Sequence, residues 1–445
     1  MLIRSVSGVR GYVNSHFTPE ISINYARALN EMLPEGVIMA GRDSRPSGEF
    51  IMIEMINEFN RLGRTVINCN IVPTPTIQFM VKNTEAVGGL IVTASHNPIE
   101  WNGLKFVRSD STFFHPSECE RLFKLVDFNK DYKSSNEKGL HWPENNAIQK
   151  HIISCVGLKT INLNRIRKKK FRIVVDAVNG AGSVALPQLL ESLGCDVIPL
   201  YCEPNGEFIR GTEPLPTNLI DLCNAVKKYK ADAGFAIDPD ADRLALVDEK
   251  GIPLGEEYTL VIAAEGYLEE IEKPEKFVVN LSTSLAIEKL ALKKGSSVER
   301  SAVGEINVVN KMNELGSNLG GEGNGGVILR ESHLGRDSLV GAAMVLNRMS
   351  QGNQKLSQIF NSLPQYQIVK DKIKLESINS DELVVKICKK FKNAQKNTID
   401  GIKFIWDDRW VHLRKSNTEP IMRIYAEAPD KIQAEELVKE VKSLI

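Results

Sequence analysis

Short apolar stretches alternate with polar loops and with segments of helical apolar spacing over most of this sequence. Over residues 37–92 the pattern predicts strand, helix, strand, helix and strand, and a similar order returns over residues 172–237 and again from residue 276. This alternation is typical of a parallel sheet covered by helices, because each strand must cross over before it pairs with the next. Its recurrence predicts related α/β units.

The pattern changes beyond about Ser362, where we expect a strand, a helix, three short strands and a closing helix. Such a tail is typical of a small α+β domain. A chain of 445 residues is expected to form two to four domains at roughly 100–200 residues each. We predict four, with boundaries at residues 1–148, 149–250, 251–364 and 365–445.

Composition narrows the classes of partner. Lys+Arg and Asp+Glu both number 56, so the net charge is zero; this balance argues against nucleic acid or a membrane as a partner. The seven cysteines contain no C-x-x-C pair, which favours reduced thiols. No long apolar segment opens the chain, so we expect a cytoplasmic protein.

The stretch TASHNP, residues 93–98, follows an apolar run over residues 86–92. That run predicts a buried strand, and Asn97-Pro98 predicts an immediate turn. Ser95 and His96 would then lie at the carboxyl edge of the sheet, where open α/β folds place their chemistry. A serine that only caps a helix or satisfies a turn is the alternative.

Three aspartates, Asp238, Asp240 and Asp242, alternate in the loop DPDADR after another predicted strand. Close carboxylates repel one another unless a cation lies among them, and oxygen ligands favour Mg²⁺ or Ca²⁺. An EF-hand is excluded because Arg243 stands where that loop requires glycine. Mg²⁺ completes its shell with water or phosphate, so a phosphate oxygen is the expected further ligand. An acidic surface turn is the alternative.

The loop GGEGNGG, residues 320–326, formally contains the G-x-G-x-x-G of dinucleotide sites. That motif must open a helix, whereas residues 327–329 predict a strand. Glu322 would also repel a pyrophosphate. Glu322 and Asn324 suit the hydroxyl groups of a sugar instead.

The loop RKSNTEP, residues 414–420, places an arginine and hydroxyl side chains between two predicted strands, and Arg423 follows. Arginines, hydroxyls and free amides are suited to a phosphate group. A solvated hairpin turn is an equally good interpretation of this loop alone.

Taken in order, TASHNP, DPDADR, GGEGNGG and RKSNTEP resemble the α-D-phosphohexomutase family over essentially the whole chain. The resemblance implies three related α/β mixed-sheet domains plus a C-terminal α+β domain around a central cleft. It also implies that Ser95 carries a phosphate that shares Mg²⁺ with the three aspartates. The phosphoryl group would pass to a sugar monophosphate and return from a 1,6-bisphosphate, with a hexose 1,6-bisphosphate as activator of this isomerase.

The same resemblance assigns roles to further residues. Arg10, Lys105 and Arg243 match positions near the transferring group, with Lys105 as the acid–base partner, and His96 matches the histidine after the phosphoserine. The residues implied to contact the sugar phosphate are Glu322, Asn324, Arg414, Ser416, Asn417, Thr418 and Arg423.

The identity of the sugar depends on finer detail. Relatives acting on glucose and mannose phosphates usually carry GEMSGH where this chain has GEGNGG. The resemblance favours glucosamine 6-phosphate and glucosamine 1-phosphate, with glucose or mannose phosphates as the alternative. The chain lacks the histidine of GEMSGH in this segment, and His333 is a candidate to contact the substrate in its place. We expect a monomer or homodimer. A serine-dependent phosphatase and a non-catalytic sugar-phosphate sensor are the competing functional classes.

Overall fold

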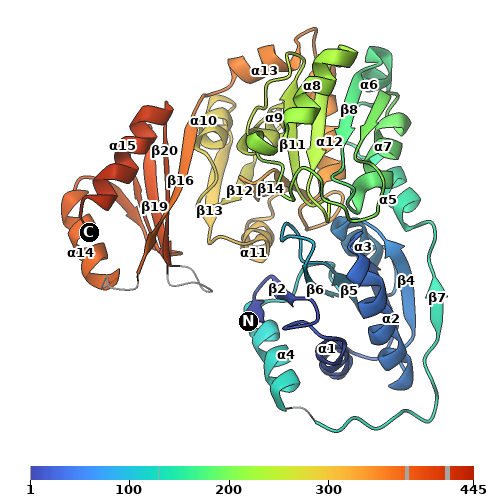
Figure 1. Ribbon diagram of the computed structural model, residues 1–445. Coiled ribbons are helices and arrows are strands. Elements are labelled where there is room, and N and C mark those ends of the chain that lie inside the picture. The colour runs from blue at the N-terminus through green and yellow to red at the C-terminus, as the bar shows by residue number, and fades with distance from the viewer. Residues whose placement is uncertain (1, 129, 376–379, 416–420, 445) are drawn as a thin grey trace.

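A computed structural model describes residues 2–128, 130–375, 380–415 and 421–444. The described strands form four separate sheets, and each sheet with its helices makes one unit of the molecule. Units I, II and III lie against one another, whereas unit IV stands to one side (Figure 1). Among the described helices, none is both long and apolar enough to cross a membrane.

Unit I is built on a seven-stranded sheet of order β1-β2-β6-β5-β3-β4-β7. Its strands are β1 (Ile3–Ser5), β2 (Gly8–Tyr12), β3 (Ile38–Arg42), β4 (Val66–Ile71), β5 (Gly88–Val92), β6 (Trp101–Arg108) and β7 (His141–Pro143). Its helices are α1 (Pro19–Met32), α2 (Pro46–Arg61), α3 (Thr74–Lys82) and α4 (Pro116–Phe128).

Units II and III each contain a four-stranded sheet. Unit II comprises α5 (Ala147–Val156), α6 (Leu163–Lys169), β8 (Arg172–Asp176), α7 (Gly182–Ser192), β9 (Asp196–Leu200), the 3-10 helix η1 (Pro216–Asn218), α8 (Ile220–Tyr229), β10 (Ala233–Ile237) and β11 (Leu244–Asp248). Unit III comprises α9 (Glu257–Leu268), β12 (Lys276–Asn280), α10 (Leu285–Lys293), β13 (Ser297–Ser301), α11 (Glu305–Leu315), β14 (Leu319–Glu322), β15 (Gly326–Leu329), α12 (Ser338–Ser350) and α13 (Leu356–Ser362).

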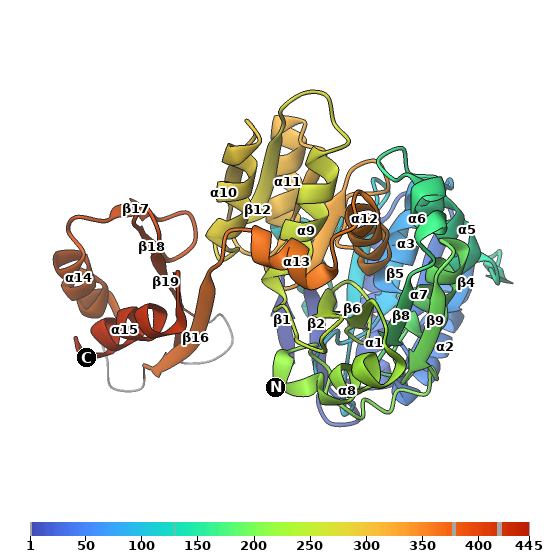
Figure 2. The ribbon, with the colours of Figure 1, turned by 90° about the horizontal axis from the view of Figure 1, so that it is seen from above.

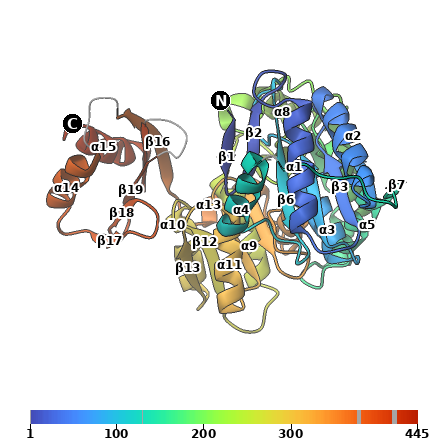
Figure 3. The same ribbon diagram turned by 90° about the horizontal axis from the view of Figure 1, so that it is seen from below.

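Unit IV is an antiparallel sheet of order β16-β20-β19-β18-β17. It comprises β16 (Gln367–Lys374), α14 (Ser380–Lys390), β17 (Gln395–Asn397), β18 (Ile402–Ile405), β19 (Trp410–Lys415), β20 (Ile421–Ala428) and α15 (Lys431–Lys442). Figure 2 shows β16 on the side of this unit that faces the rest of the molecule. In Figure 3, β1 and β2 lie on the side of unit I that faces unit IV.

The first three sheets repeat one arrangement of four strands. In each, three parallel strands are followed by one antiparallel strand: β4-β3-β5-β6, β9-β8-β10-β11 and β13-β12-β14-β15. The predicted repeat and the predicted class, three related α/β mixed-sheet units plus an α+β unit, are therefore confirmed. The carboxyl ends of the parallel strands are where loops can gather functional groups.

Local sequence accounts for these elements. Helix α2 begins with Pro46, whose fixed φ suits a first helical turn, and its apolar residues at helical spacing, such as Ile51, Met55 and Phe59, are buried. Units II and III share one continuous apolar core. Unit IV has a core of its own.

Two local expectations were wrong. Four strands, β17 to β20, follow α14 rather than three. The segment 320–326 is not one loop: residues 320–322 end β14, and only residues 323–325 form the turn to β15. Glycines carry little strand propensity of their own, so pairing with β12 and β15 decides this outcome.

Candidate active site

A cavity of about 360 Å³ lies where the four units meet, a volume within the usual range for small-molecule sites. All four units contribute to its wall. The predicted site residues on that wall are Arg10, Ser95, His96, Lys105, Arg243, Glu322, Asn324, Arg414 and Arg423. The structure thus gathers residues that lie more than 400 positions apart in the sequence.

Ser95 lies just beyond the end of β5 and is almost fully buried. Its φ of 51° places it in the left-handed region, which is uncommon for a residue with a side chain. The Ser95 hydroxyl lies 3.3 Å from Nδ1 of His96, and the Ser95 amide donates to Oγ1 of Thr93 at 2.9 Å. The predicted turn at the sheet edge therefore presents Ser95 to the cavity.

His96 is held beside a cation. Arg243 donates from Nη2 to Nδ1 of His96 at 3.0 Å, so this nitrogen accepts and carries no proton. Burial and the charges of Arg243 and Arg10 hold the pKa of His96 well below its usual value. Arg10 in turn donates to the side chain of Asn97 at 2.8 Å. The lowered pKa and the bond from Arg243 therefore make His96 a weak base.

The three aspartates follow β10 and are fully buried. One oxygen of each carboxylate, Oδ2 of Asp238 and Oδ1 of Asp240 and of Asp242, has no hydrogen-bond partner. Carboxylate oxygens of the three residues lie within 4.8 Å of one another. Burial and the charges of Asp242 and Asp240 raise the pKa of Asp238 well above its usual value. Converging, unpartnered oxygens fit a hard divalent cation, which would relieve this repulsion.

Lys105 ties this loop to unit I. Its ammonium lies 2.6 Å from Oδ2 of Asp240 and 3.3 Å from Oδ2 of Asp242. Burial would lower the pKa of Lys105, but Asp240 and Asp242 outweigh it and raise the pKa. Thr74, at the start of α3, donates its hydroxyl to Asp240 at 2.8 Å. The aspartate loop of unit II is thus held by residues of unit I, beside the wall that carries Ser95.

Glu322 is connected to the same loop by Arg336. Arg336 donates to Oε2 of Glu322 at 2.8 Å and to Oδ2 of Asp242 at 2.6 Å, and it also bonds Glu305 at 3.0 Å. Oε1 of Glu322 accepts from Asn280 at 2.7 Å. Protein groups therefore already engage Glu322, and Asn324 at the adjoining turn is the more open partner for a hydroxyl group.

Glu257 lies against the turn that follows β14. A Cβ atom added at Gly323 would lie 2.0 Å from Oε2 of Glu257, so a side chain there would require the Glu257 carboxylate to move. Burial raises the pKa of Glu257 to about 8, although the charge of Lys370 opposes this. Glu257 lines the cavity, and it places an acidic group in the part of the wall that carries Asn324.

Two arginines face each other across the hairpin of unit IV. Arg414 on β19 pairs in register with Arg423 on β20, and Lys372 on β16 is the next partner of Arg423. Like charges opposite one another are destabilising. Asp400 pairs with Arg414 at 2.9 Å and offsets part of this repulsion, and the remaining positive charge of the row favours an anion. The predicted contacts Ser416, Asn417 and Thr418 lie outside the described residues.

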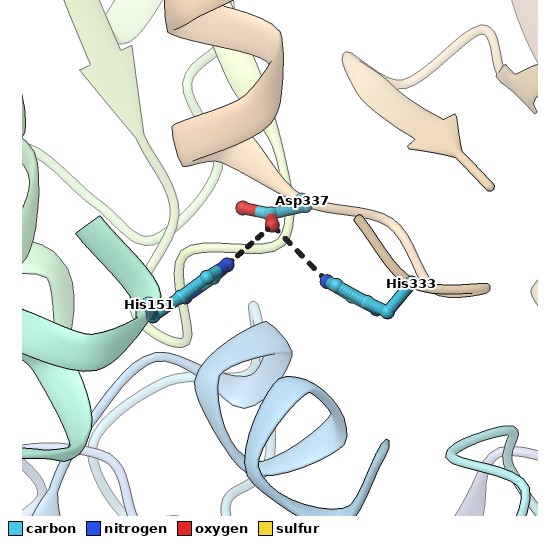
Figure 4. Close-up of side chains that lie close together, drawn as sticks. All are labelled: His151, His333 and Asp337. Atoms are coloured by element: carbon cyan, nitrogen blue, oxygen red, sulfur yellow. Dashed lines mark hydrogen bonds and ion pairs between the residues drawn. The ribbon is translucent and has the colours of Figure 1, made fainter. Parts of the chain in front are cut away.

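His333 does not reach the cavity. Its imidazole is fully buried and bonds Oδ2 of Asp337 at 3.1 Å, and His151 of α5 bonds the same oxygen at 2.9 Å (Figure 4). Asp337 also caps α12 by accepting from Leu339 at 2.8 Å. The expectation that His333 contacts substrate is therefore not met; its imidazole instead joins elements of units II and III.

Sequence reasoning did not identify the cavity groups Glu257 and Arg336, nor Arg45, which bonds the backbone of the Ser95 turn without lining the cavity. Arg45 stands in the polar loop after β3, and Arg336 directly precedes the helix start at Asp337. Arg45 follows the parallel strand β3, as Ser95 follows β5 and Asp238 follows β10. That shared position is the signal that could have drawn attention to Arg45, whereas Arg336 follows the antiparallel strand β15 and has no such signal.

The comparisons with known proteins cover the chain in four segments. Sequence families for domains I, II and III and the C-terminal domain of phosphoglucomutase/phosphomannomutase match residues 1–133, 150–251, 255–366 and 370–444. The matches follow the order of units I to IV. The fold and the matched domains thus define a sugar-phosphate mutase of four domains.

Curated relatives that match almost the whole chain are mutases of the same family. A Methanopyrus kandleri protein named "Probable phosphoglucosamine mutase" is 32% identical over 99% of this chain and 96% of its own length. A Thermococcus kodakarensis phosphoglucomutase/phosphomannomutase is 34% identical over 97% of this chain and 96% of its own. The phosphoglucosamine/phosphogalactosamine mutase of Sulfurisphaera tokodaii is 30% identical over 98% of both. The chain belongs to the phosphoglucomutase/phosphomannomutase family of α-D-phosphohexomutases.

Solved structures support the fold. A phosphoglucomutase/phosphomannomutase family protein from Burkholderia thailandensis superposes with a TM-score of 0.85 at 24% identity, covering 99% of this chain and 97% of that one. The open form of Paramecium parafusin, a phosphoglucomutase, gives a TM-score of 0.80 at 18% identity, covering 99% and 94%.

Proposed function

We propose that this enzyme interconverts glucosamine 6-phosphate and glucosamine 1-phosphate, with Ser95 as the carrier of the phosphoryl group. The observation that carries the proposal is that Ser95 lines one cavity with Lys105 and Arg243. These two cations in turn pair with the buried aspartates of the neighbouring loop. Several relatives bear names that specify glucosamine phosphate. The alternative, glucose or mannose phosphate, is supported by the name of the Thermococcus kodakarensis relative.

The residues that would hold the metal are Asp238, Asp240 and Asp242, together with the phosphate on Ser95. Mg²⁺ is the ion that we propose, because the donors are all oxygen. A bound Mg²⁺ would neutralise negative charge on the phosphoryl group. Phosphate monoesters react so slowly unaided that about 20 kcal/mol of stabilisation is needed, and most of it must come from positioning and fixed charge.

The transfer is balanced as follows. The Oγ–P bond of phosphoserine breaks, an O–P bond to a sugar hydroxyl forms, the hydroxyl loses its proton, and Oγ of Ser95 gains one. We assign the proton transfer to Lys105: its ammonium would give a proton to Oγ of Ser95 and regain one from the sugar hydroxyl. His96 is the weaker base, because its pKa is lowered and its Nδ1 already accepts from Arg243. Arg10 and Arg243 contribute positive charge beside the serine loop. The bisphosphate that results would return its other phosphate to Ser95.

Arg414 and Arg423 would bind the phosphate that is not being transferred, since arginine pairs with phosphate through two parallel hydrogen bonds. Asn324 and the adjoining turn would contact the sugar hydroxyls. A bisphosphate that reorients in the cavity can present either phosphate to the same serine, which is why one site suffices for both half-reactions. A hexose 1,6-bisphosphate is accordingly the expected activator.

The test compares turnover of glucosamine 1-phosphate, glucose 1-phosphate and mannose 1-phosphate with Mg²⁺ and a trace of glucose 1,6-bisphosphate. We expect isomerisation of the glucosamine compound with the highest kcat/KM. Equal values would contradict the sugar preference, and release of inorganic phosphate in place of isomerisation would favour a phosphatase. Intact mass should show one phosphoryl group on the wild type and none on Ser95→Ala.

A further inference from the structure

Arg45, in the loop after β3, has a fully buried side chain and uses all five N–H groups of its guanidinium. Two of its donors bond the backbone oxygens of Ser95 and Asn97, at 2.5 and 2.8 Å. Two more bond the backbone oxygens of Pro98 and Trp101, at 2.5 and 3.0 Å. The fifth forms an ion pair with Asp43 at 2.9 Å. One side chain thus determines the path of the whole turn after β5.

Asp43 extends this contact to the other end of the Ser95 peptide. Oδ2 of Asp43 accepts from the hydroxyl of Thr93 at 2.6 Å, and the same hydroxyl oxygen accepts from the Ser95 amide at 2.9 Å. The amide of Ser95 is therefore fixed through Thr93 and its carbonyl through Arg45. Both routes meet at Asp43.

The bonds to the amide and the carbonyl of Ser95 hold its backbone in a conformation that is unfavourable by itself. A left-handed φ costs a residue with a side chain about 1 kcal/mol, and Ser95 has a φ of 51°. Left-handed conformations that persist at a functional site require surroundings that hold them in place. The Asp43–Arg45 pair provides such surroundings at the residue whose hydroxyl faces the cavity.

Unit II covers the pair from the outside. The Phe208 ring lies over the Arg45 guanidinium at 4.9 Å. Gly206 approaches so closely that an added Cβ would lie 2.6 Å from the backbone oxygen of Ser44. These contacts keep water from the ion pair, whose two side chains are both fully buried. Removing one partner of such a pair leaves the other charge buried without compensation, which strongly destabilises the folded protein.

We propose that Arg45 and Asp43 are positioning residues that set the Ser95 backbone for phosphoryl transfer; the inference rests on the proposed function and goes beyond it. Neither residue lines the cavity. Their effect is therefore expected in the chemistry at Ser95, and not in the affinity for the sugar phosphate or in the affinity of the unphosphorylated enzyme for Mg²⁺.

The test substitutes Arg45→Lys, which keeps the charge but offers three donors in place of five. Phosphorylation of Ser95 by glucose 1,6-bisphosphate is followed by intact mass in rapid-quench samples. We expect the rate to fall by about 100-fold, since a displacement of 1 Å in a reacting group has that effect. KM for the sugar phosphate and the calorimetric Kd for Mg²⁺ should change by less than about threefold.

Arg64→Lys is the matched control. Arg64 is another buried arginine of unit I that bonds backbone oxygens, those of Pro34 and Gly36 at 2.8 and 3.0 Å, but it does not contact the Ser95 turn. It should lose thermal stability like Arg45→Lys while keeping the wild-type phosphorylation rate. Equal rates for the two variants would overturn the inference, as would an Arg45→Lys effect confined to KM or Mg²⁺ affinity.

Thr93→Val gives a second test should Arg45→Lys not fold. It removes only the link between Asp43 and the Ser95 amide, and we expect a phosphorylation rate about tenfold lower; an unchanged rate would overturn the inference. Measurements on the wild-type protein distinguish failure of the proposed function from failure of the positioning role. If it takes no phosphate onto Ser95, the proposed function fails; if it does and both variants match it, only the positioning role fails.

Discussion

Glu257 illustrates how a single side chain can be constrained from several directions. Its carboxylate fills the space that a side chain at residue 323 would need, and it accepts from the amide of Ser284 at the start of α10. Burial raises its pKa to about 8. A carboxyl group with a raised pKa binds its proton more tightly in the folded state, so the stability it contributes is lost as pH rises from its unfolded pKa toward 8.

Replacing Glu257 with Gln should remove this part of the pH dependence. We expect the wild type to lose more thermal stability than Glu257→Gln between about pH 5.5 and 8.5, so that the variant is the more stable of the two at the higher pH. Thermal unfolding of both proteins in matched buffers measures the difference. Parallel curves would show that the Glu257 pKa lies at its ordinary value.

At the scale of elements, the hairpin of β19 and β20 carries the proposed binding site for the phosphate that is not transferred. Arg414, Arg423 and Lys372 lie in register on three neighbouring strands. Asp400 offsets part of their mutual repulsion by pairing with Arg414, and a bound anion would relieve the rest. Removing one of these positive charges should therefore lower the affinity for the phosphate while leaving the stability of the ligand-free sheet unchanged or slightly higher.

Arg423→Gln is expected to raise KM for the sugar phosphate by about tenfold or more, because a charged hydrogen bond to the phosphate is lost. Without ligand, the variant should unfold at a temperature equal to or slightly above that of the wild type. Lys372→Gln is the control: Lys372 does not line the cavity, so it should relieve repulsion with a smaller change in KM. A lower melting temperature for Arg423→Gln would contradict this account.

The sequence predicted functional residues correctly where reactive side chains directly follow a predicted strand. Ser95 and the aspartates were identified because each follows an apolar strand of the repeat. Arg45, Arg336 and Glu257 were not identified, because their partners lie up to 94 positions away, as for Arg336 and Asp242. His333 was misjudged because spacing near the sugar-binding segment cannot show which way an imidazole faces. Burial against His151 decided it.

At the scale of the whole molecule, the acidic loop is a joint between units. Asp240 belongs to unit II, but it bonds Thr74 and Lys105 of unit I, while Asp242 bonds Arg336 of unit III. A cation held by this loop would therefore stabilise the contact of all three units. A ligand that binds only the folded state raises the melting temperature by mass action.

We accordingly expect millimolar Mg²⁺ to raise the melting temperature by a few degrees and a chelator to abolish both this shift and turnover. Asp240→Asn should lose the shift. Asp248→Asn is the matched control, because Asp248 lies at the end of β11 and bonds only backbone amides of its own turn, such as those of Lys250 and Ile252. Scanning calorimetry with and without Mg²⁺ distinguishes the two variants; an equal shift in both would exclude metal binding at Asp240.

The connection between α4 and β7 joins the elements that carry Ser95 and Lys105 to the rest of the chain. Its residues 130–140 are mostly exposed, and they link the part of the chain that carries Ser95 and Lys105 to the part that carries the aspartates. A polypeptide divided there would yield two fragments, each incomplete as a catalyst, whose reunion restores the missing neighbour. Sugar-phosphate turnover would then report complementation, and the molecule could serve as a split sensor for the association of whatever is fused to its new ends.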